Sequence, residues 1–215
     1  MGKGLFITFE GVEGSGKSTQ IELLRDALEK AGRKTLATRS PGGTPVAEAI
    51  RNILKHKRTD EELMPETELL LFAACHSQSM KWLLGPALER GEIVLCDRFF
   101  DSTTAYQGCA RGLSFDFVRK INEFSCRGLK PDLTILLDLP PESGTKRAIA
   151  RAGAAAVNAD RFDSEAMHFH EKVREGFLLL AKADPERFRI FDATLPIEAL
   201  HNSIAETLRN EFGIL

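Results

Sequence analysis

Several features that would place this chain outside the ordinary globular class are missing from its 215 residues. No hydrophobic run approaches the roughly 20 apolar residues of a membrane helix. Neither sign of charge is in excess, because 29 Lys and Arg face 31 Asp and Glu for a formal net charge of -2. Such a balance gives no general attraction to nucleic acid or to an anionic membrane, so we expect neither as a partner.

Paired cysteines and an export signal are missing as well. The four cysteines form no C-x-x-C pair and stand far apart, at Cys75, Cys96, Cys109 and Cys126. This spacing predicts reduced thiols in a cytoplasmic protein, without zinc or disulfides. The apolar run at residues 5–9 is too short for a signal peptide and stops at Glu10.

Short apolar runs alternate with longer helical patterns along the chain. The runs predict strands at 5–10, 35–39, 93–97, 133–139 and 188–192. Helices are predicted at about 17–31, 45–56, 66–90, 114–127, 141–152, 164–183 and 196–212. Apolar strands separated by helices indicate an α/β three-layer sandwich around a five-stranded parallel sheet. The length suits one hydrophobic core, so we expect a single domain over residues 1–215.

A phosphate-binding loop lies between the first predicted strand and the first predicted helix. It fits the pattern G-x-x-x-x-G-K-[ST] in full, with Gly11, Val12, Glu13, Gly14, Ser15, Gly16, Lys17, Ser18 and Thr19. Its glycines let backbone N–H groups turn toward phosphate oxygens, and the helix adds its positive end. Lys17 is expected at the β- and γ-phosphates and Ser18 at Mg²⁺. The loop predicts a P-loop NTPase that binds ATP or GTP, but it does not identify the acceptor.

Two arginines follow predicted strands and could meet a second phosphate. Arg39 ends the second strand before a Pro-Gly-Gly turn, where it could clamp a phosphate or simply be solvated in an ordinary turn. Asp97 and Arg98 directly follow the third strand. Asp97 can hold a water on Mg²⁺, and Arg98 would point at the transferring phosphate.

A third basic cluster suggests a mobile lid over about residues 144–163. Arg147 and Arg151 precede a run of small residues, and Asp160 and Arg161 follow it. Arginines that arrive when a lid closes can neutralise charge developing on the γ-phosphate. The alternative is a solvated helix face.

These motifs, taken in order, resemble the bacterial type of thymidylate kinase, a nucleoside monophosphate kinase, over essentially the whole chain. They are Phe9-Glu10-Gly11 with the P-loop, Arg39-x-Pro41-Gly42-Gly43-Thr44, Asp97-Arg98-x-x-x-Ser102-x-x-Ala105-Tyr106-Gln107, Pro131-Asp132-Leu133-Thr134 with Leu137-Asp138, and Asp192-Ala193-Thr194. The resemblance implies a homodimeric, Mg²⁺-dependent enzyme that transfers the ATP γ-phosphate to dTMP in dTTP biosynthesis.

The resemblance also implies roles for individual residues. Arg39 and Arg98 would hold the dTMP phosphate, and Phe72 would stack on the thymine. The remaining contacts would come from Tyr106 against the deoxyribose, Ser102 and Gln107 at the base or sugar edge, and Glu10 near the sugar and metal. Since the P-loop offers no arginine at Val12 or Glu13, the catalytic arginine would be Arg147 or Arg151 from the lid.

The chain departs from the family pattern at three positions. Ser40 stands where a glutamate is usual, Asp163 replaces another glutamate, and His76 stands where an arginine usually reads the thymine carbonyl. Residues four apart share a helix face, so Phe72 and His76 are expected to meet the same base. The departures leave two alternatives: a kinase that prefers another base, or a nucleotide-binding regulator with little turnover. Activity measured with a panel of nucleoside monophosphates at fixed ATP identifies the preferred base and so tests the first alternative. Measurable steady-state turnover excludes the second.

Overall fold

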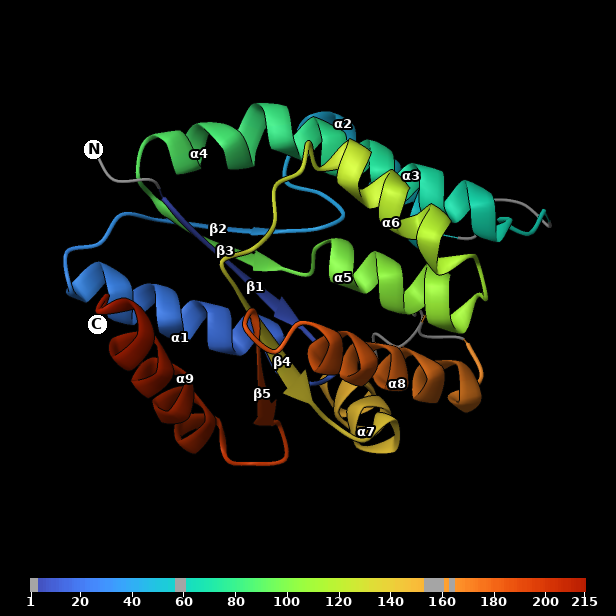
Figure 1. Ribbon diagram of the computed structural model, residues 1–215. Helices are drawn as coiled ribbons and strands as arrows, with labels where there is room; N and C mark the ends of the chain where they lie inside the picture. The colour runs from blue at the N-terminus through green and yellow to red at the C-terminus, as the bar shows by residue number, and fades with distance from the viewer. Residues whose placement is uncertain (1–3, 57–60, 153–160, 163–164) are drawn as a thin grey trace.

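The computed structural model describes residues 4–56, 61–152, 161–162 and 165–215, with backbone alone at 151 and 152 (Figure 1). Part of the expected lid, residues 153–160 and 163, which include Asp160 and Asp163, lies outside the described residues. The side chain of Arg151 lies outside them too.

The described chain is built on one parallel sheet of five strands, in the order β2-β3-β1-β4-β5. The strands are β1 (Leu5–Glu10), β2 (Thr35–Arg39), β3 (Ile93–Asp97), β4 (Leu133–Asp138) and β5 (Phe188–Asp192). The predicted five-stranded sheet is confirmed. In the register of the pairing, Asp97 lies opposite both Phe9 and Arg39. The carboxyl ends of β1, β2 and β3 therefore meet at one edge of the sheet, where α/β proteins place their ligands.

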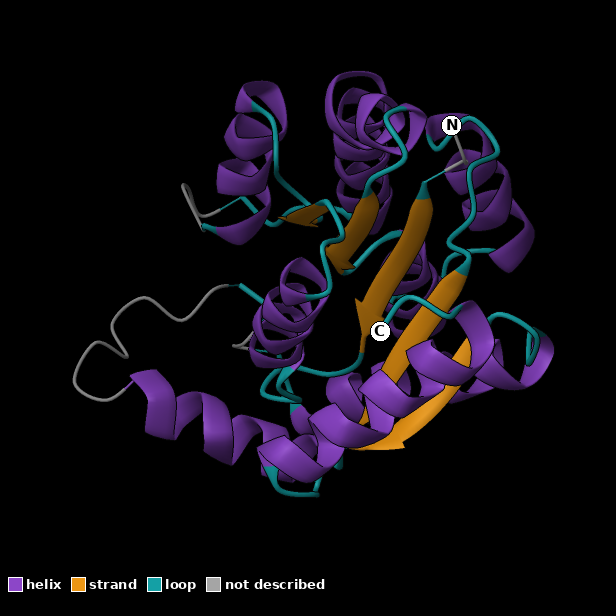
Figure 2. Ribbon diagram, turned by 90° about the vertical axis from the view of Figure 1, so that its left-hand side faces the viewer, coloured by secondary structure: helices purple, strands orange, loops and turns teal. Residues whose placement is uncertain are grey.

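Helices cover both faces of the sheet (Figures 1 and 2). Helices α1 (Lys17–Lys30) and α9 (Ile197–Phe212) pack on the face to which β1 contributes Ile7 and Phe9. The opposite face is covered by two groups of buried residues, one of which contains Phe6 and the other Leu136. The elements on that side include η1 (Met80–Leu84), α4 (Gly85–Glu89), η2 (Thr104–Ala110) and α8 (Met167–Ala183). This arrangement confirms the three-layer sandwich. The other described helices are α2 (Pro45–Lys55), α3 (Pro65–Ser79), α5 (Phe100–Thr103), α6 (Phe115–Ser125) and α7 (Pro141–Ala152).

The helix predicted over 66–90 is present but contains a π-helical segment, η1. Pro86 causes it, because proline has no N–H and its ring collides with the carbonyl four residues earlier in a regular α-helix. The N–H of Gly85 instead bonds to the carbonyl of Met80, five residues back.

The helical segment at residues 100–110, formed by α5 and η2, was not predicted. Its sequence gives little local signal, because it contains Ser102, Thr103 and Thr104, all weak helix formers. Tertiary contacts hold it instead. The amide of Asn122 in α6 donates to the hydroxyl of Thr104 (3.1 Å), and Ala105 packs in the buried group that also contains Phe177 of α8.

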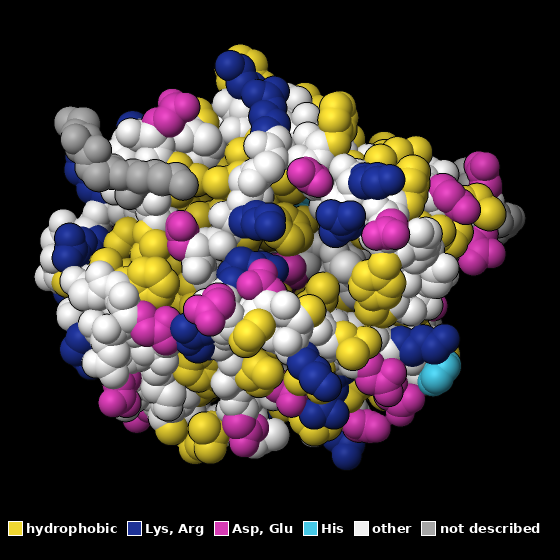
Figure 3. Space-filling view, in the orientation of Figure 1, with side chains coloured by type: hydrophobic (Ala, Val, Ile, Leu, Met, Phe, Trp, Pro, Cys, Tyr) yellow, Lys and Arg dark blue, Asp and Glu magenta, His cyan; other side chains and the backbone are white. Residues whose placement is uncertain are grey.

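The surface has no dominant charge on the face seen in Figure 3, where basic and acidic side chains are interspersed. Among the described residues, no helix combines the length and apolar character that crossing a membrane would require.

Candidate active site

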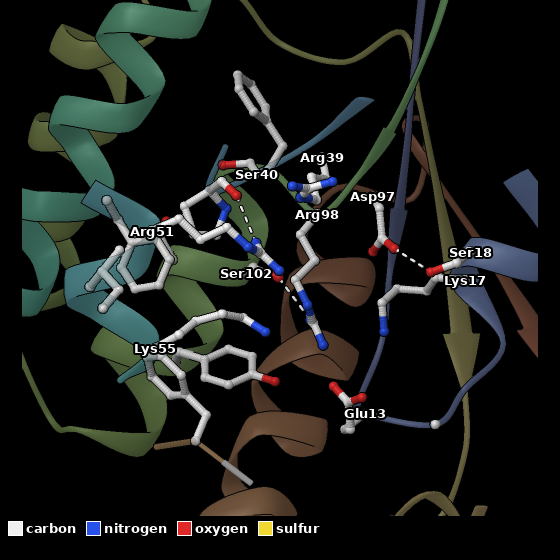
Figure 4. A pocket seen from close by; sticks show the side chains of 18 of the residues that line it. Glu13, Lys17, Ser18, Arg39, Ser40, Arg51, Lys55, Asp97, Arg98 and Ser102 are labelled. Carbon is white, nitrogen blue, oxygen red and sulfur yellow. Dashed lines mark hydrogen bonds between the residues drawn. The ribbon is translucent and has the colours of Figure 1, made fainter. Parts of the chain in front are cut away.

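A pocket of about 380 Å³ lies at the carboxyl edge of the sheet (Figure 4). This volume falls in the range of small-molecule sites, roughly 300–1,000 Å³. We call the part lined by the P-loop and Asp97 the P-loop end. The part lined by Arg39 and by residues of α2, α3 and η2, together with Phe162, is called the helical end. Arg98 lies between the two ends in Figure 4.

The P-loop adopts the conformation that the glycine pattern predicts. Gly14 and Gly16 have φ values of 72° and 92°, a region that other L-residues rarely adopt. A Cβ on Gly14 would lie 2.3 Å from the carbonyl oxygen of Gly144, so a larger residue does not fit there. Gly16 is the N-cap of α1, which leaves the open N–H groups of the first helical turn beside the loop. The P-loop end is therefore built to bind an anion.

Lys17 curls back over this loop. Its Nζ donates to the carbonyl oxygens of Gly11 (3.2 Å) and Val12 (2.9 Å) and to the hydroxyl of Ser15 (3.3 Å). Burial, helped by the nearby positive charge of Arg98, lowers its pKa to about 8. At neutral pH the side chain is still mainly a cation, held where phosphate oxygens would replace backbone carbonyls as its partners.

Ser18 and Asp97 bring two oxygen ligands together beside the loop. The Ser18 hydroxyl donates to a carboxylate oxygen of Asp97 at 2.8 Å, although 79 residues separate them in the sequence. Hard oxygen donors of this kind suit Mg²⁺. In the described part of the chain, no three His, Cys, Asp or Glu residues cluster in a way that could hold a metal. A Mg²⁺ ion bound here would therefore need phosphate oxygens and water as further ligands.

Arg98 has a strained backbone that directs its side chain into the pocket. Its φ is 67°, which for a residue other than glycine costs about 1–3 kcal/mol. Two contacts impose this conformation: its N–H bonds to Phe9 O (2.9 Å), and its carbonyl accepts from the Cys96 thiol (3.0 Å). The guanidinium donates to Ser102 Oγ (3.0 Å) and lies 5.3 Å from the ring centroid of Tyr106. Strain held in this way is typical of a functional residue.

Glu10 supports Arg98 instead of lining the pocket, contrary to the expectation that it lies near the sugar and metal. It is fully buried, and its carboxylate accepts from the N–H of Phe99 (2.8 Å), the N–H of Ser102 (3.3 Å) and the hydroxyl of Ser102 (2.6 Å). Burial, with the charge of Asp101, raises its pKa to about 7. Both oxygens are thus committed to holding the segment that carries Arg98 and Ser102.

His76 is also placed differently from the expectation. It is 1% exposed and is not among the side chains that line the pocket. The ring of Phe99, which does line the pocket, packs against the imidazole at 5.0 Å between ring centroids. Neither ring nitrogen has a hydrogen-bond partner among the described residues, and burial lowers the pKa to about 4. His76 is therefore a neutral core residue in this structure.

The helical end combines cations with aromatic rings. Arg39 donates to Glu48 (2.9 Å), and Arg51 donates to the carbonyl of Pro41 (2.7 Å). Lys55 lines the pocket one helical turn after Arg51. Neither α2 residue was predicted from the sequence, although their spacing of four places them on a shared helix face.

Phe162 is a further lining residue that was not predicted from the sequence. Its ring centroid lies 6.1 Å from that of Phe72 and 5.8 Å from that of Tyr106. The three rings enclose the helical end, where Gln107 is also a lining residue. Such a surface suits a flat, apolar group such as a base.

The lid arginines are not brought to the pocket by the described residues. Arg147 in α7 donates to the carbonyl of Ala193 (2.8 Å), beyond the end of β5, and does not line the pocket. Since the side chain of Arg151 is not described, a catalytic arginine at that position stays a prediction.

A phosphate-binding loop at one end of the pocket, and cations with aromatic rings at the other, define a P-loop nucleotide kinase. Comparison with known proteins identifies the family. The thymidylate kinase family model matches residues 9–204. The chain is 47% identical to the thymidylate kinase of Citrifermentans bemidjiense over 99% of its length and 94% of that protein. It is 46% identical to that of Geobacter sulfurreducens, over 96% and 97%.

A solved structure gives the same result. The crystal structure of thymidylate kinase from Ehrlichia chaffeensis has a TM-score of 0.77 and 31% sequence identity to this chain, and the match covers 97% of this chain and 99% of that one. The chain belongs to the thymidylate kinase family, whose enzymes phosphorylate dTMP with ATP on the way to dTTP. The resemblance stated from the sequence motifs is thereby confirmed.

Proposed function

We propose that this pocket carries out the reaction of its family, with the triphosphate of ATP at the P-loop end and dTMP at the helical end. The observation that supports this most directly is the position of Arg98, whose guanidinium lies between Lys17 and the cations of α2 (Figure 4). A cation in that place can contact both the transferring phosphoryl group and the phosphate that receives it.

The reaction requires the protein mainly to position the reacting phosphates and to supply positive charge around them. Lys17 and the backbone N–H groups of the loop hold the β- and γ-phosphates, while Arg98 and Arg39 hold the acceptor phosphate. The acceptor oxygen is thereby aligned with the bond that breaks, and no strong general base is needed. Arg51 and Lys55 add positive charge near the acceptor phosphate.

Mg²⁺ is part of the proposal, with the Ser18 hydroxyl as one ligand and Asp97 holding a metal-bound water. When bound, the ion neutralises charge on the β- and γ-phosphates. The hydrogen bond between Ser18 and Asp97 supports this assignment because it already places both oxygens beside the loop.

At the helical end we propose that the thymine stacks on Phe72 and that Tyr106 lies against the deoxyribose. Gln107 contacts the base edge. Ser102 acts as the support of Arg98, because its hydroxyl accepts from Arg98 and donates to Glu10. One of the lid arginines, Arg151 or Arg147, completes the charge stabilisation of the γ-phosphate.

We further propose that the protein is a cytoplasmic homodimer. Helices α3 and α6 lie side by side and expose Leu70, Phe117 and Phe124, with exposed fractions of 56%, 51% and 83%. An exposed apolar surface of this kind is typical of an interface. Light scattering after gel filtration tests the dimer, and a monomer at micromolar concentration contradicts it.

The reaction itself is tested by ADP release with fixed ATP across dTMP, dUMP, dCMP, dGMP and dAMP. The expected result is the highest kcat/KM with dTMP, together with loss of turnover when EDTA removes Mg²⁺ and recovery when Mg²⁺ is restored. Preference for a purine monophosphate would contradict the assignment of the acceptor. Absence of turnover with every acceptor would leave only the nucleotide-binding regulator.

A further inference from the structure

Glu48 lies beside the pocket at the start of α2, and the reaction described above gives it no role. Its side chain does not line the pocket, but its Oε1 accepts from Nη2 of Arg39 (2.9 Å), which does. The same oxygen accepts from the N–H of Gly43 (2.9 Å), in the turn that joins β2 to α2. One carboxylate oxygen thus connects the arginine at the end of β2 to the turn that follows it.

The local backbone determines where this carboxylate lies. Thr44 is the N-cap of α2, so Glu48 stands in the first helical turn, where the positive end of the helix favours a negative charge. Gly42 has a φ of 134°, and a Cβ there would lie 2.6 Å from Oε1 of Glu48. The hydrogen bond from Gly43, together with the charge of Arg39, holds the pKa of Glu48 below its ordinary value. Glu48 is therefore an ionised acceptor at neutral pH.

The turn has other contacts that hold it, whereas the guanidinium of Arg39 is half exposed. Arg51 of α2 donates to the carbonyl of Pro41 (2.7 Å), and the Ser79 hydroxyl of α3 donates to that of Gly42 (3.0 Å). The side chain of Arg39 is 53% exposed, and a long exposed side chain loses conformational entropy when it is ordered. Removal of the Glu48 carboxylate is therefore expected to leave the turn in place and to release the guanidinium.

We propose that Glu48 is a positioning residue for the acceptor phosphate, which holds the guanidinium of Arg39 in one orientation before the phosphate binds. This inference rests on the proposed contact between Arg39 and the dTMP phosphate. Glu48 binds only Nη2, so Nε and Nη1 of the guanidinium remain as donors for phosphate oxygens. A cation that is already oriented costs less entropy to engage, and binding of the phosphate is stronger for that reason.

Charge and positioning predict opposite effects of this carboxylate on binding. By charge alone, a carboxylate next to Arg39 repels the phosphate, so its removal would strengthen the binding of dTMP. If Glu48 positions Arg39, its removal weakens the binding of dTMP, because the guanidinium must then be ordered when the ligand arrives. The sign of the change therefore distinguishes the two roles.

The test is Glu48→Ala, with the Kd measured by titration calorimetry for dTMP and for thymidine, which lacks the phosphate. Glu48 is 38% exposed, so the variant is expected to fold. The Kd for dTMP should rise about fivefold, the size of one exposed ionic contact, while the Kd for thymidine and the KM for ATP stay unchanged. Glu48→Gln keeps an oxygen that can accept from both donors, and it should remain within about twofold of the wild type.

A control variant and a double-mutant cycle complete the experiment. Glu211→Ala removes the carboxylate partner of Arg189, away from the pocket lining, and should change neither Kd. In an Arg39→Met background, Glu48→Ala should cause no further rise in the Kd for dTMP, because it acts only through that arginine.

Three results would overturn the proposal. The first is an unchanged or lower Kd for dTMP in Glu48→Ala. The second is an equal weakening of dTMP and thymidine binding, which would indicate a general distortion of the pocket. The third is an undiminished effect of Glu48→Ala in the Arg39→Met background. The proposed function fails separately, if the wild type does not phosphorylate dTMP.

Discussion

The two ends of the pocket are built in different ways. The P-loop end is built mainly from one unbroken segment, in which backbone N–H groups and a lysine surround the phosphate site, and Asp97 joins it from the end of β3. The helical end collects side chains from Arg39, α2, α3, η2 and Phe162, which are widely separated in the chain. A site made from contiguous backbone depends on local conformation, whereas a site made from dispersed side chains depends on how helices pack. Substitutions at the first kind of site should therefore mainly lower kcat, and substitutions at the second kind should mainly raise the KM for the acceptor.

The largest effect is expected at the P-loop end. Lys17→Ala removes a cation aimed at charge that develops in transfer, so kcat should fall by about 10²–10³. Lys55→Ala, the matched change at the helical end, should mainly raise the KM for dTMP. Steady-state kinetics with each substrate varied in turn measure both. A Lys17→Ala enzyme with a near-normal kcat would refute the assignment of the P-loop, and circular dichroism confirms that each variant is folded.

The next effect compares the two arginines that follow strands. Arg98→Lys loses the forked guanidinium that Ser102 and Tyr106 orient, so kcat/KM for dTMP should fall by about 10². Arg39→Lys should cost less, because Glu48 already shares the charge of Arg39 at the pocket rim. We therefore expect a loss of about tenfold there, expressed in the KM for dTMP. Equal losses at the two positions would show that Arg98 has no special place between donor and acceptor.

Local sequence patterns predicted the parts of the molecule that local conformation determines. The strands follow from apolar runs, and the P-loop from glycines such as Gly14 and Gly16 that need positive φ. The carboxyl edge of a parallel sheet then brought Arg39, Asp97 and Arg98 together as expected. None of these inferences required knowledge of helix packing.

The parts that were missed depend on tertiary contacts. The helix at 100–110 has weak intrinsic propensity and is held by α6 and α8, so its sequence alone gives no reason to expect it. Glu10 lies at a strand end, where the pattern suggests a ligand contact. Both oxygens of its carboxylate instead accept hydrogen bonds, one from the N–H of Phe99 and the other from the hydroxyl of Ser102. A spacing of four correctly relates Phe72 to His76 along α3, yet it cannot reveal that His76 is buried against Phe99 and does not line the pocket.

The smallest effect is expected at His76, which tests whether this residue belongs to the helical end of the pocket or to the core. Substitution of a core residue should change stability and leave substrate recognition unchanged. Burial holds the pKa of His76 at about 4, below its ordinary value of 6.5. The unfolded chain therefore binds the proton first, and the stability that neutral His76 provides above pH 6.5 is lost as the pH falls toward 4. Glu10 has the opposite sign, because its raised pKa makes its contribution disappear as the pH rises from about 4.5 to 7. The free energy of unfolding of the wild type should therefore depend only weakly on pH, because the contributions of His76 and Glu10 oppose each other.

His76→Leu removes the contribution of the histidine to the pH dependence of stability. The difference in free energy of unfolding between the wild type and the variant therefore measures that contribution alone. Replacing a buried ring whose nitrogens lack partners by an apolar group should be nearly neutral at pH 7. At about pH 5 the variant should gain about 2 kcal/mol relative to the wild type, the value that follows from the two pKa values of the histidine. Urea unfolding at both pH values measures this, and His168→Leu at an exposed site is the control, expected to follow the wild type. Kinetic constants for dTMP and dUMP should be unchanged in His76→Leu. A rise in the KM for dTMP without a pH-dependent change in stability would instead place the imidazole against the base, as the sequence alone suggested.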